Sequence, residues 1–228
     1  MFRETCGEYA VVVAGGEIQE NSQHLKRLLD LVRGASLLVA ADSGAAFLSQ
    51  HKIVPSVLVG DFDSCDDSIV NEMECRGTEI VRLNRRKDKT DTEVALDIIV
   101  DRGYGWCFVI GALGGARKEH SLANVMLIET YVRKGLDVVL DSGSTVICSI
   151  VGKGRRRFRG KMGDWVSLFP ITREVTGVST CGLEFPLREA TLLRGSTYGV
   201  SNVMTKEEAL VCIDQGFLLI IITDGDVS

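Results

Sequence analysis

Two aspartates, Asp61 and Asp63, have the type and spacing of residues that bind a metal ion. They follow the apolar run 57–59 in the segment Val-Leu-Val-Gly-Asp-Phe-Asp-Ser. Alternate side chains of an extended chain point to the same side, so both carboxylates can face one ligand while Phe62 points away. Paired carboxylates suit Mg²⁺, which takes its other ligands from water and phosphate groups. Gly, Asp and Ser also favour a simple turn, so other segments must decide between the two interpretations.

Apolar runs of strand length alternate with helical periodicity over the first 140 residues. We expect strands at 9–14, 36–41, 57–59, 79–83, 106–110 and 137–140. We expect helices at 25–32, 45–51, 66–76, 94–99 and 122–132. This alternation predicts an α/β domain with a mostly parallel sheet flanked by helices. Ligands of such sheets bind where the strands end, which is where Asp61 and Asp63 are expected.

A third acidic side chain lies at a strand end. Asp42 directly follows the expected strand at 36–41, and Ser43 and Gly44 come after it. The carboxyl ends of parallel strands share one edge of the sheet. Asp42 is therefore expected on the ligand edge.

Two loops that precede helices carry further candidate residues. Thr90 and Glu93 have the spacing of a capping box, and the helix dipole favours acidic residues in a first turn, so Asp91 also has a purely structural explanation. Gly114 and Gly115 lie between a strand and a helix, where glycines let the backbone approach an anion. Their spacing matches neither the dinucleotide-binding fingerprint nor the P-loop.

The pattern changes at about residue 142, after which glycine and β-forming residues dominate. Strands are expected at 145–151, 165–169, 174–178, 190–193, 209–213 and 218–222. Several short strands at this spacing predict an all-β domain, a small sandwich. We therefore expect an α/β domain over residues 1–141 and a β-sandwich domain over residues 142–228.

The charge distribution bears on possible partners. The net charge of −5 argues against a protein dedicated to binding nucleic acid or an anionic membrane. Six of the nine residues at 153–161 are basic. We interpret this stretch as a solvated hairpin tip, with a phosphate or nucleic-acid contact as the alternative.

The cysteines and apolar runs bear on the cellular compartment. Seven cysteines lie far apart, with no Cys-x-x-Cys pair and an odd total, so neither a zinc site nor a disulfide framework is indicated. The N-terminus lacks the residue order of a signal peptide. The longest apolar run, 216–222, is too short to span a bilayer. We expect a cytoplasmic protein.

Several segments, taken in order, carry motifs. They are Ala-Asp-Ser-Gly at 41–44, Gly-Asp-Phe-Asp-Ser at 60–64, Lys-Asp-Lys-Thr-Asp at 87–91, Gly-Gly at 114–115 with His-Ser-Leu-Ala-Asn at 120–124, and β segments at 166–170, 182–187 and 195–202. Together they resemble the thiamine pyrophosphokinase family along nearly the whole chain. The ordered set is far more specific than any one motif.

The resemblance implies transfer of a pyrophosphoryl group from ATP to the hydroxyethyl oxygen of thiamine, giving thiamine diphosphate and AMP. It also implies an α/β domain that holds ATP and Mg²⁺, a β domain that supplies the thiamine pocket, and a homodimer with the active site between protomers. Phosphoryl transfer depends mainly on positioning and charge neutralisation, which agrees with an acidic metal site.

The same resemblance assigns residues to roles. The implied catalytic residues are Asp61, Asp63, Asp91, Arg117 and Glu119; the three aspartates bind Mg²⁺, with Asp42 beside them, and Arg117 offsets charge on the transferred group. The residues implied to contact ATP are Asp42, Ser43, Gly44, Lys87, Asp88, Thr90, Gly114, Gly115, His120 and Asn124. The residues implied to contact thiamine are Phe185, Ser196, Ser201 and Asn202.

Two positions depart from the family pattern. The family reads Gly-Gly-Arg-x-Asp-His, whereas this chain reads Gly-Gly-Ala-Arg-Lys-Glu-His, with one extra residue and Glu119 in place of Asp. Misplacing a catalytic group by about 1 Å can lower a rate about a hundredfold. Phe185 stands where relatives carry Trp or Tyr, so it offers packing against the thiamine rings without a polar edge.

Two other functions fit parts of the chain. Phosphatases of the haloacid-dehalogenase type also place Asp-x-Asp after an apolar strand, but they do so on the first strand, whereas Asp61 and Asp63 follow the third. The altered loop around Arg117 would also suit a non-catalytic relative that only binds thiamine or a nucleotide. Measuring AMP, thiamine diphosphate and inorganic phosphate separates the three functions.

Overall fold

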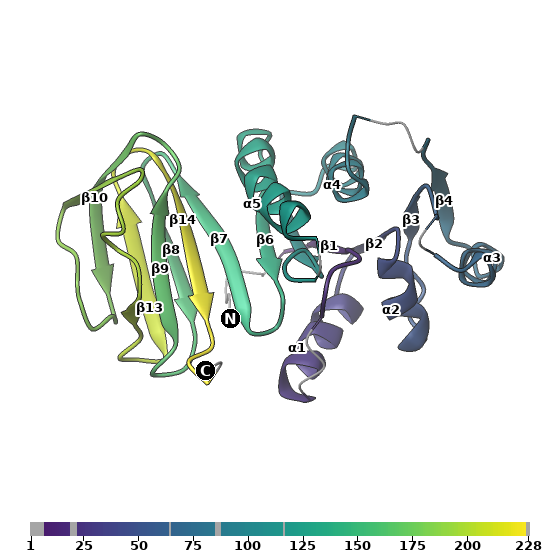
Figure 1. Ribbon diagram of the computed structural model, residues 1–228, viewed down its shortest axis with the longest axis horizontal. Helices are drawn as coiled ribbons and strands as arrows, with labels where there is room; N and C mark the ends of the chain where they lie inside the picture. The colour runs from purple at the N-terminus through teal and green to yellow at the C-terminus, as the bar shows by residue number, and fades with distance from the viewer. Residues whose placement is uncertain (1–6, 19–21, 64, 85–87, 116, 227–228) are drawn as a thin grey trace. The chain divides into compact units, whose positions relative to one another are not determined.

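The structure, a computed structural model, describes residues 7–18, 22–63, 65–84, 88–115 and 117–226. The chain divides into two compact units, one from Glu8 to Gly143 and the other formed by the residues from Ser144 onward. Figure 1 shows helices and strands in the first unit and strands in the second. Within the described residues, no helix is long and apolar enough to cross a membrane.

The first unit alternates strands and helices, as expected. Its strands are β1 Ala10–Val13, β2 Leu37–Ala41, β3 Val57–Gly60, β4 Glu79–Arg82, β5 Trp106–Ile110 and β6 Asp137–Asp141. Its helices are α1 Ser22–Arg33, α2 Gly44–Gln50, α3 Asp67–Cys75, α4 Asp91–Asp101 and α5 Lys118–Arg133. The predicted α/β architecture is confirmed, and α5 begins four residues before the expected start at Leu122.

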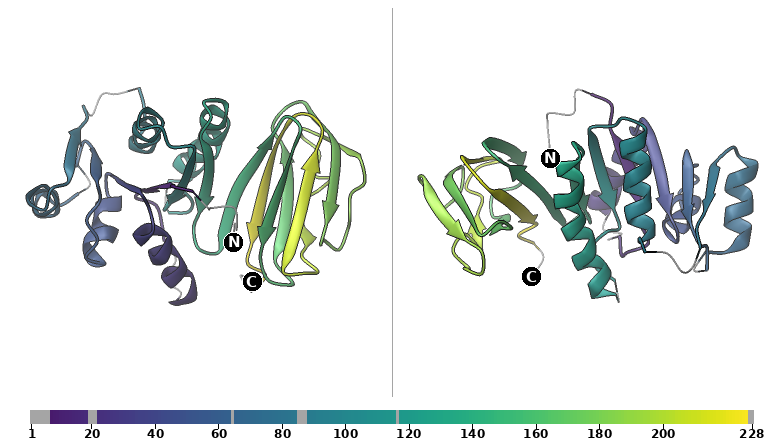
Figure 2. Two further views of the ribbon diagram at one scale, coloured as in Figure 1. Left: turned by 180° about the vertical axis from the view of Figure 1, so that it is seen from behind. Right: turned by 90° about the horizontal axis from the view of Figure 1, so that it is seen from above.

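The strands of this unit form a parallel sheet in the order β6-β5-β1-β2-β3-β4. Strand β1 is fully buried, as a parallel strand covered on both faces must be. Figure 1 shows α4 and α5 on one face of the sheet and α1 and α2 on the other, and Figure 2 shows this unit from behind and from above.

The strand order reverses between β1 and β5. From β1 the chain moves outward to β2, β3 and β4, whereas from β5 it moves the other way to β6. The loops after β1 and β5 therefore lead to opposite faces of the sheet, which leaves a crevice beside the ends of these two strands. Open α/β sheets bind ligands in this crevice, at the carboxyl ends of the strands.

The second unit is an antiparallel β domain. Its strands are β7 Thr145–Val151, β8 Gly154–Arg159, β9 Trp165–Pro170, β10 Glu174–Cys181, β11 Ala190–Leu193, β12 Asn202–Val203, β13 Glu208–Ile213 and β14 Phe217–Thr223. They form two sheets, β12-β9-β14-β7 and β11-β10-β13-β8. Alternate residues of β9 and β13 are buried, which gives each strand one core face. The all-β prediction is confirmed.

The basic stretch 153–161 is mainly a strand, so its interpretation as a hairpin tip is wrong. Strand β8 pairs with β13 along its whole length, from Gly154 opposite Ile213 to Arg159 opposite Glu208. Its inward side chains, Arg156 and Phe158, are buried. The arginines point alternately in and out on an edge strand, a place where charged side chains discourage pairing with another chain. In the sequence, the run of basic residues hides the alternation of buried and exposed side chains that is typical of a strand.

Candidate active site

A pocket of about 610 Å³ opens at the carboxyl edge of the parallel sheet. Residues that follow β1, β2, β3 and β5 line it, together with the first turns of α4 and α5. The sequence-predicted residues that line it are Asp42, Ser43, Asp61, Asp63, Asp88, Thr90, Asp91, Gly114, Gly115, Arg117, His120 and Asn124. Segments far apart in the sequence thus meet at the place where the strand order reverses. Lys87 lies outside the described residues.

Three of the carboxylates that line this pocket lie close together. One oxygen from each of Asp42, Asp61 and Asp63 lies within 4.8 Å of the others. Parallel pairing of β2 and β3 brings the two strand ends together. Phe62 is buried as expected, but its φ of +57° means that the chain is not extended there, so strand alternation is not what places Asp61 and Asp63 on one side. Asp91 lines the same pocket from the start of α4. Hard cations prefer such oxygen ligands.

Asp42 occupies the most strained and least solvated position of the three. Its φ is +48°, and within the described residues its Oδ1 is buried without a hydrogen-bond partner. Burial raises the pKa of Asp42 above its ordinary value, and the negative charges of Asp91, Asp61 and Asp63 raise it further, against a hydrogen bond from the Ser43 backbone. A buried carboxylate oxygen among like charges is the setting that a divalent cation stabilises.

Neutralising Asp42 should therefore stabilise the metal-free protein. A raised folded-state pKa means that ionisation of Asp42 costs stability as pH rises above the unfolded-state value, so Asp42→Asn removes this cost at neutral pH. Asparagine also tolerates the left-handed backbone at this position. In EDTA, the melting temperature should rise by about 1–2 °C, a small shift because solvent screens a carboxylate that is only partly buried.

The matched control is Asp67→Asn, which neutralises an exposed aspartate in the first turn of α3. Its melting temperature should stay the same or fall slightly, because acidic groups favour a helix N-terminus. An Asp42→Asn melting temperature equal to or below that of the wild-type protein in EDTA would refute the electrostatic argument. Scanning calorimetry of both variants measures the difference.

The start of α4 brings a second polar segment to the pocket. Thr90 caps the helix, and its Oγ1 accepts a hydrogen bond of 3.2 Å from the Glu93 backbone. The predicted cap is therefore confirmed. This segment caps the helix and lines the pocket at the same time. The Thr90 hydroxyl accepts from a backbone N–H of the first turn, while Asp88, Thr90 and Asp91 all line the pocket.

The loop after β5 is shaped by glycines and tied to α5. Gly114 and Gly115 have φ of +81° and +76°, values that glycine adopts without strain. Asn124 is buried, and its Nδ2 donates a 2.9 Å hydrogen bond to the Ala112 carbonyl oxygen. The Ser121 hydroxyl bonds the Gly114 carbonyl oxygen at 3.1 Å. Asn124 thus supports the loop backbone from within; its predicted contact with ATP stays a prediction.

Gly15 and Gly16 were not among the expected site residues, but both line the pocket. The Gly16 N–H donates a 2.8 Å hydrogen bond to the Gly111 carbonyl oxygen, which joins the loops after β1 and β5. A Cβ on Gly16 would lie 3.0 Å from the Gly111 carbonyl carbon, so only glycine permits this approach. The detectable signal was a glycine pair directly after the first strand.

Arg117 lines the pocket, but Glu119, which the resemblance implied to be catalytic, is not among the residues that line it. Arg117 Nε bonds Glu119 Oε1 at 2.8 Å, and about two thirds of each side chain is exposed. The Arg117 hydrogen bond lowers the pKa of Glu119 below its ordinary value. Arg117 lines the pocket and begins α5 as its N-cap residue. The longer loop therefore still delivers its arginine to the site.

The residues implied to contact thiamine lie in the second unit. Phe185 is 62% exposed. The Asn202 side-chain amide forms two hydrogen bonds with the Phe185 backbone. Its Oδ1 accepts from the Phe185 N–H at 3.0 Å, and its Nδ2 donates to the Phe185 carbonyl oxygen at 2.7 Å. Ser201 has φ of +62°, and Ser196 Oγ accepts from the Tyr198 backbone at 3.1 Å. Asn202 thus presents the Phe185 ring; thiamine contacts of these residues stay predictions.

Comparison with known families agrees with this division. The family model described as the thiamin pyrophosphokinase catalytic domain matches residues 28–140, which lie in the α/β unit. The model described as the thiamin pyrophosphokinase vitamin B1 binding domain matches residues 155–218, which lie in the β unit. The two models together match well over half of the chain.

Individual relatives resemble this chain in sequence over most of its length. Thiamine pyrophosphokinase of Bacillus subtilis is 23% identical over 186 residues, 82% of this chain and 86% of the relative. Thiamine pyrophosphokinase 2 of Arabidopsis thaliana is 25% identical over 241 residues, covering 94% of this chain and 86% of the relative.

Solved structures extend the comparison. The Bacillus subtilis thiamine pyrophosphokinase structure superimposes with a TM-score of 0.83 at 22% identity, covering 95% of this chain and 99% of the other. Thiamin pyrophosphokinase of Geobacillus thermodenitrificans gives a TM-score of 0.78 at 25% identity, with coverages of 95% and 97%. With both domain models matched in order and the acidic pocket in place, this chain belongs to the thiamin pyrophosphokinase family.

Proposed function

We propose that this protein transfers a pyrophosphoryl group from ATP to thiamine. The hydroxyethyl oxygen of thiamine forms a bond to the β-phosphorus of ATP as the bond between that phosphorus and the α–β bridging oxygen breaks. Thiamine loses its hydroxyl proton, and AMP leaves. Thiamine diphosphate and AMP are the products.

The observation that carries this proposal is the group formed by Asp42, Asp61 and Asp63 in a pocket at the reversal of strand order. Parallel α/β sheets bind nucleotides at this place. The acidic group fits a divalent cation, since a buried Asp42 oxygen lies among like charges within reach of two further carboxylates. Asp61 and Asp63 would hold Mg²⁺ together with Asp42, and Asp91, the third ligand implied by the resemblance, lines the same pocket. Bound Mg²⁺ would neutralise charge on the polyphosphate.

The chain's other groups have separate tasks. The glycine loop with Gly114 and Gly115 leaves room for phosphate oxygens near the N-terminus of α5. Arg117, exposed at the pocket rim, offsets the charge that develops on the transferred group. Phe185, fixed through Asn202, supplies an apolar face for the thiamine rings.

We also propose a homodimer with the active site at the protomer interface, acting in the cytoplasm. Two large apolar side chains on the outer face of β9 support self-association, since Trp165 is 45% and Phe169 37% exposed. The six cysteines in the described part of the chain are free thiols, which suits a reducing compartment. Sedimentation equilibrium of the purified chain tests the dimer.

The decisive experiment incubates the protein with ATP, thiamine and Mg²⁺ and quantifies nucleotides and thiamine esters. Equal amounts of AMP and thiamine diphosphate, formed only with a divalent cation, are expected. Inorganic phosphate release without AMP would indicate the Asp-x-Asp phosphatase instead. Binding of thiamine or ATP without any product would indicate the non-catalytic relative.

A further inference from the structure

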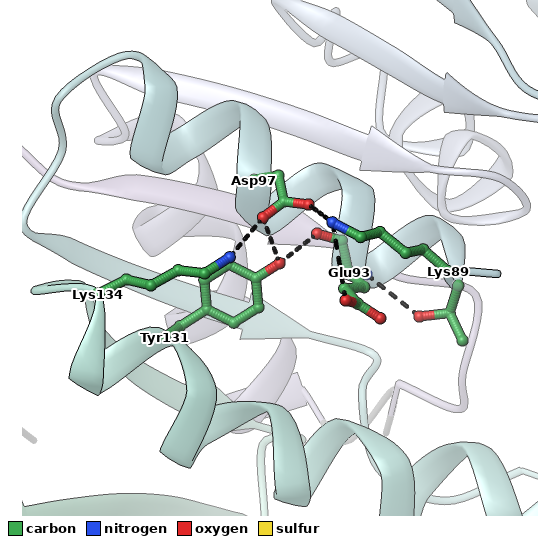
Figure 3. A network of polar contacts seen from close by, with 6 residues as sticks. Lys89, Glu93, Asp97, Tyr131 and Lys134 are labelled. Atoms are coloured by element: carbon green, nitrogen blue, oxygen red, sulfur yellow. Dashed lines mark hydrogen bonds and ion pairs between the residues drawn. The ribbon is translucent and has the colours of Figure 1, made fainter.

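A polar network joins α4 to α5 (Figure 3). Asp97, on α4, is its centre. Its Oδ2 accepts from Lys89 Nζ at 2.5 Å, and its Oδ1 accepts from Lys134 Nζ at 2.9 Å. Tyr131, on α5, brings its hydroxyl to 2.9 Å from the same Oδ1. One carboxylate thus gathers three donors from two separate segments, the loop before α4 and the C-terminal end of α5.

Removing one member of this network should cost free energy, because a buried polar group would lose its hydrogen-bond partner. Tyr131 is fully buried, and its hydroxyl proton is shared between Asp97 Oδ1 and the Glu93 carbonyl oxygen at 2.7 Å. Burial opposes ionisation of Asp97, but hydrogen bonds from Lys89, Lys134 and Tyr131 outweigh it and hold the pKa below its ordinary value. Charge-assisted hydrogen bonds of this kind are the stronger class.

Lys89 belongs to the network and to the pocket at once. Lys89 lines the pocket beside Asp88, Thr90 and Asp91. Its ammonium group nevertheless binds Asp97, which lies eight residues later in the sequence, on α4. A second, longer contact joins Lys89 Nζ to Glu93 Oε1 at 3.9 Å. The segment before α4 is therefore anchored to the body of the helix, and Tyr131 and Lys134 anchor that helix to α5.

We infer that Asp97 is a positioning residue: by holding the Lys89 ammonium, it fixes the segment from Asp88 to Asp91 at the rim of the nucleotide pocket. The inference rests on the proposed function and extends it to a residue that is absent from the pocket lining. Displacements of about 1 Å at a reacting site can change rates about a hundredfold, so the anchoring of an acidic segment matters.

The first test replaces Asp97 by asparagine, which keeps the volume but removes the charge. The KM for Mg·ATP should rise about five- to tenfold, as expected for weakening one charge-assisted hydrogen bond. The KM for thiamine should stay within about twofold of the wild-type value, because the anchored segment lines the nucleotide pocket. An unchanged KM for Mg·ATP would refute the inference.

A double-mutant cycle asks whether Asp97 acts through Lys89. Lys89→Met alone should raise the KM for Mg·ATP, and adding Asp97→Asn should then change it by less than about twofold, because interacting residues give non-additive effects. If the two increases multiply, Asp97 acts independently of Lys89 and the inference fails. Tyr131→Phe, which removes only the hydroxyl, gives a second route should Asp97→Asn fold poorly; a smaller increase of the same kind is expected.

Backbone hydrogen exchange supplies a readout that needs no turnover. Without nucleotide, amides of residues 88–93 should exchange faster in Asp97→Asn than in the wild-type chain, since the anchor is lost. The matched control is Glu129→Gln, which breaks an exposed ion pair with Arg133 on α5 and should leave both exchange and KM unchanged. Unchanged exchange in Asp97→Asn refutes the positioning role, whereas a wild-type chain that forms no AMP refutes the proposed function.

Discussion

Replacing Asp61 or Asp63 by asparagine should lower turnover by about a thousandfold, equivalent to about 4 kcal/mol of transition-state stabilisation. The exchange keeps the side-chain volume and removes the negative charge that a divalent cation needs. Both carboxylates belong to the acidic group at the strand ends, so each loss leaves an incomplete ligand set. The rate of AMP formation at saturating ATP, thiamine and Mg²⁺ measures the effect.

The control for this experiment is again Asp67→Asn, a short distance along the chain but outside the pocket. Its turnover should match the wild-type rate, and the circular dichroism spectra of all three variants should coincide. Wild-type turnover in Asp61→Asn or Asp63→Asn, with the fold intact, would remove the basis for a metal site at these residues. A loss of helical signal would instead mean that the carboxylates support the fold.

Strands and helices with a regular local pattern could be predicted from the sequence. The expected strands at 106–110, 145–151 and 190–193 match β5, β7 and β11 at both ends. In each of these segments the apolar residues are contiguous or alternate regularly, and the flanking residues break the pattern. Strand β8 was missed because consecutive arginines hid its alternation, which only burial of Arg156 and Phe158 reveals.

The position of the acidic residues at the sheet edge could be predicted from the sequence, but the electrostatics of the pocket could not. Alternating strands and helices place Asp42 and Asp61 at one edge of a parallel sheet, and that inference needs no knowledge of neighbouring strands. The raised pKa of Asp42 depends on burial and on charges from β3 and α4 together, which are separate segments. The pKa shift of Asp42 can be predicted only when the strand order is known, because it requires β2 to lie beside β3.

Contacts between helices were beyond sequence reasoning. Asp97 and Tyr131 are 34 residues apart, and nothing in either segment identifies the other as its partner. The same limit applies to Lys89, whose contact with Asp97 on α4 nothing in the loop sequence predicts. Side-chain pairing across helices depends on their packing, which the helical period constrains only to a face.

Gly44 has a packing role that is separate from its predicted contact with ATP. The family resemblance implied that Gly44 contacts ATP, but the residues that line the pocket include Asp42 and Ser43 without it. Instead Gly44 is buried at the start of α2, where a Cβ would lie 2.7 Å from the carbonyl carbon of Val13. The absence of a side chain at Gly44 lets the start of α2 pack closely against the end of β1.

Gly44→Ala should therefore destabilise the protein by about 3 kcal/mol, because a methyl group must displace the β1 backbone rather than a flexible side chain. The melting temperature should fall by about 6–12 °C. Gly105→Ala is the matched control, since a Cβ there meets nothing within 4 Å, and its stability should be unchanged or slightly higher. If Gly44→Ala keeps the wild-type melting temperature and raises only the KM for Mg·ATP, Gly44 contacts the nucleotide and the packing explanation is wrong.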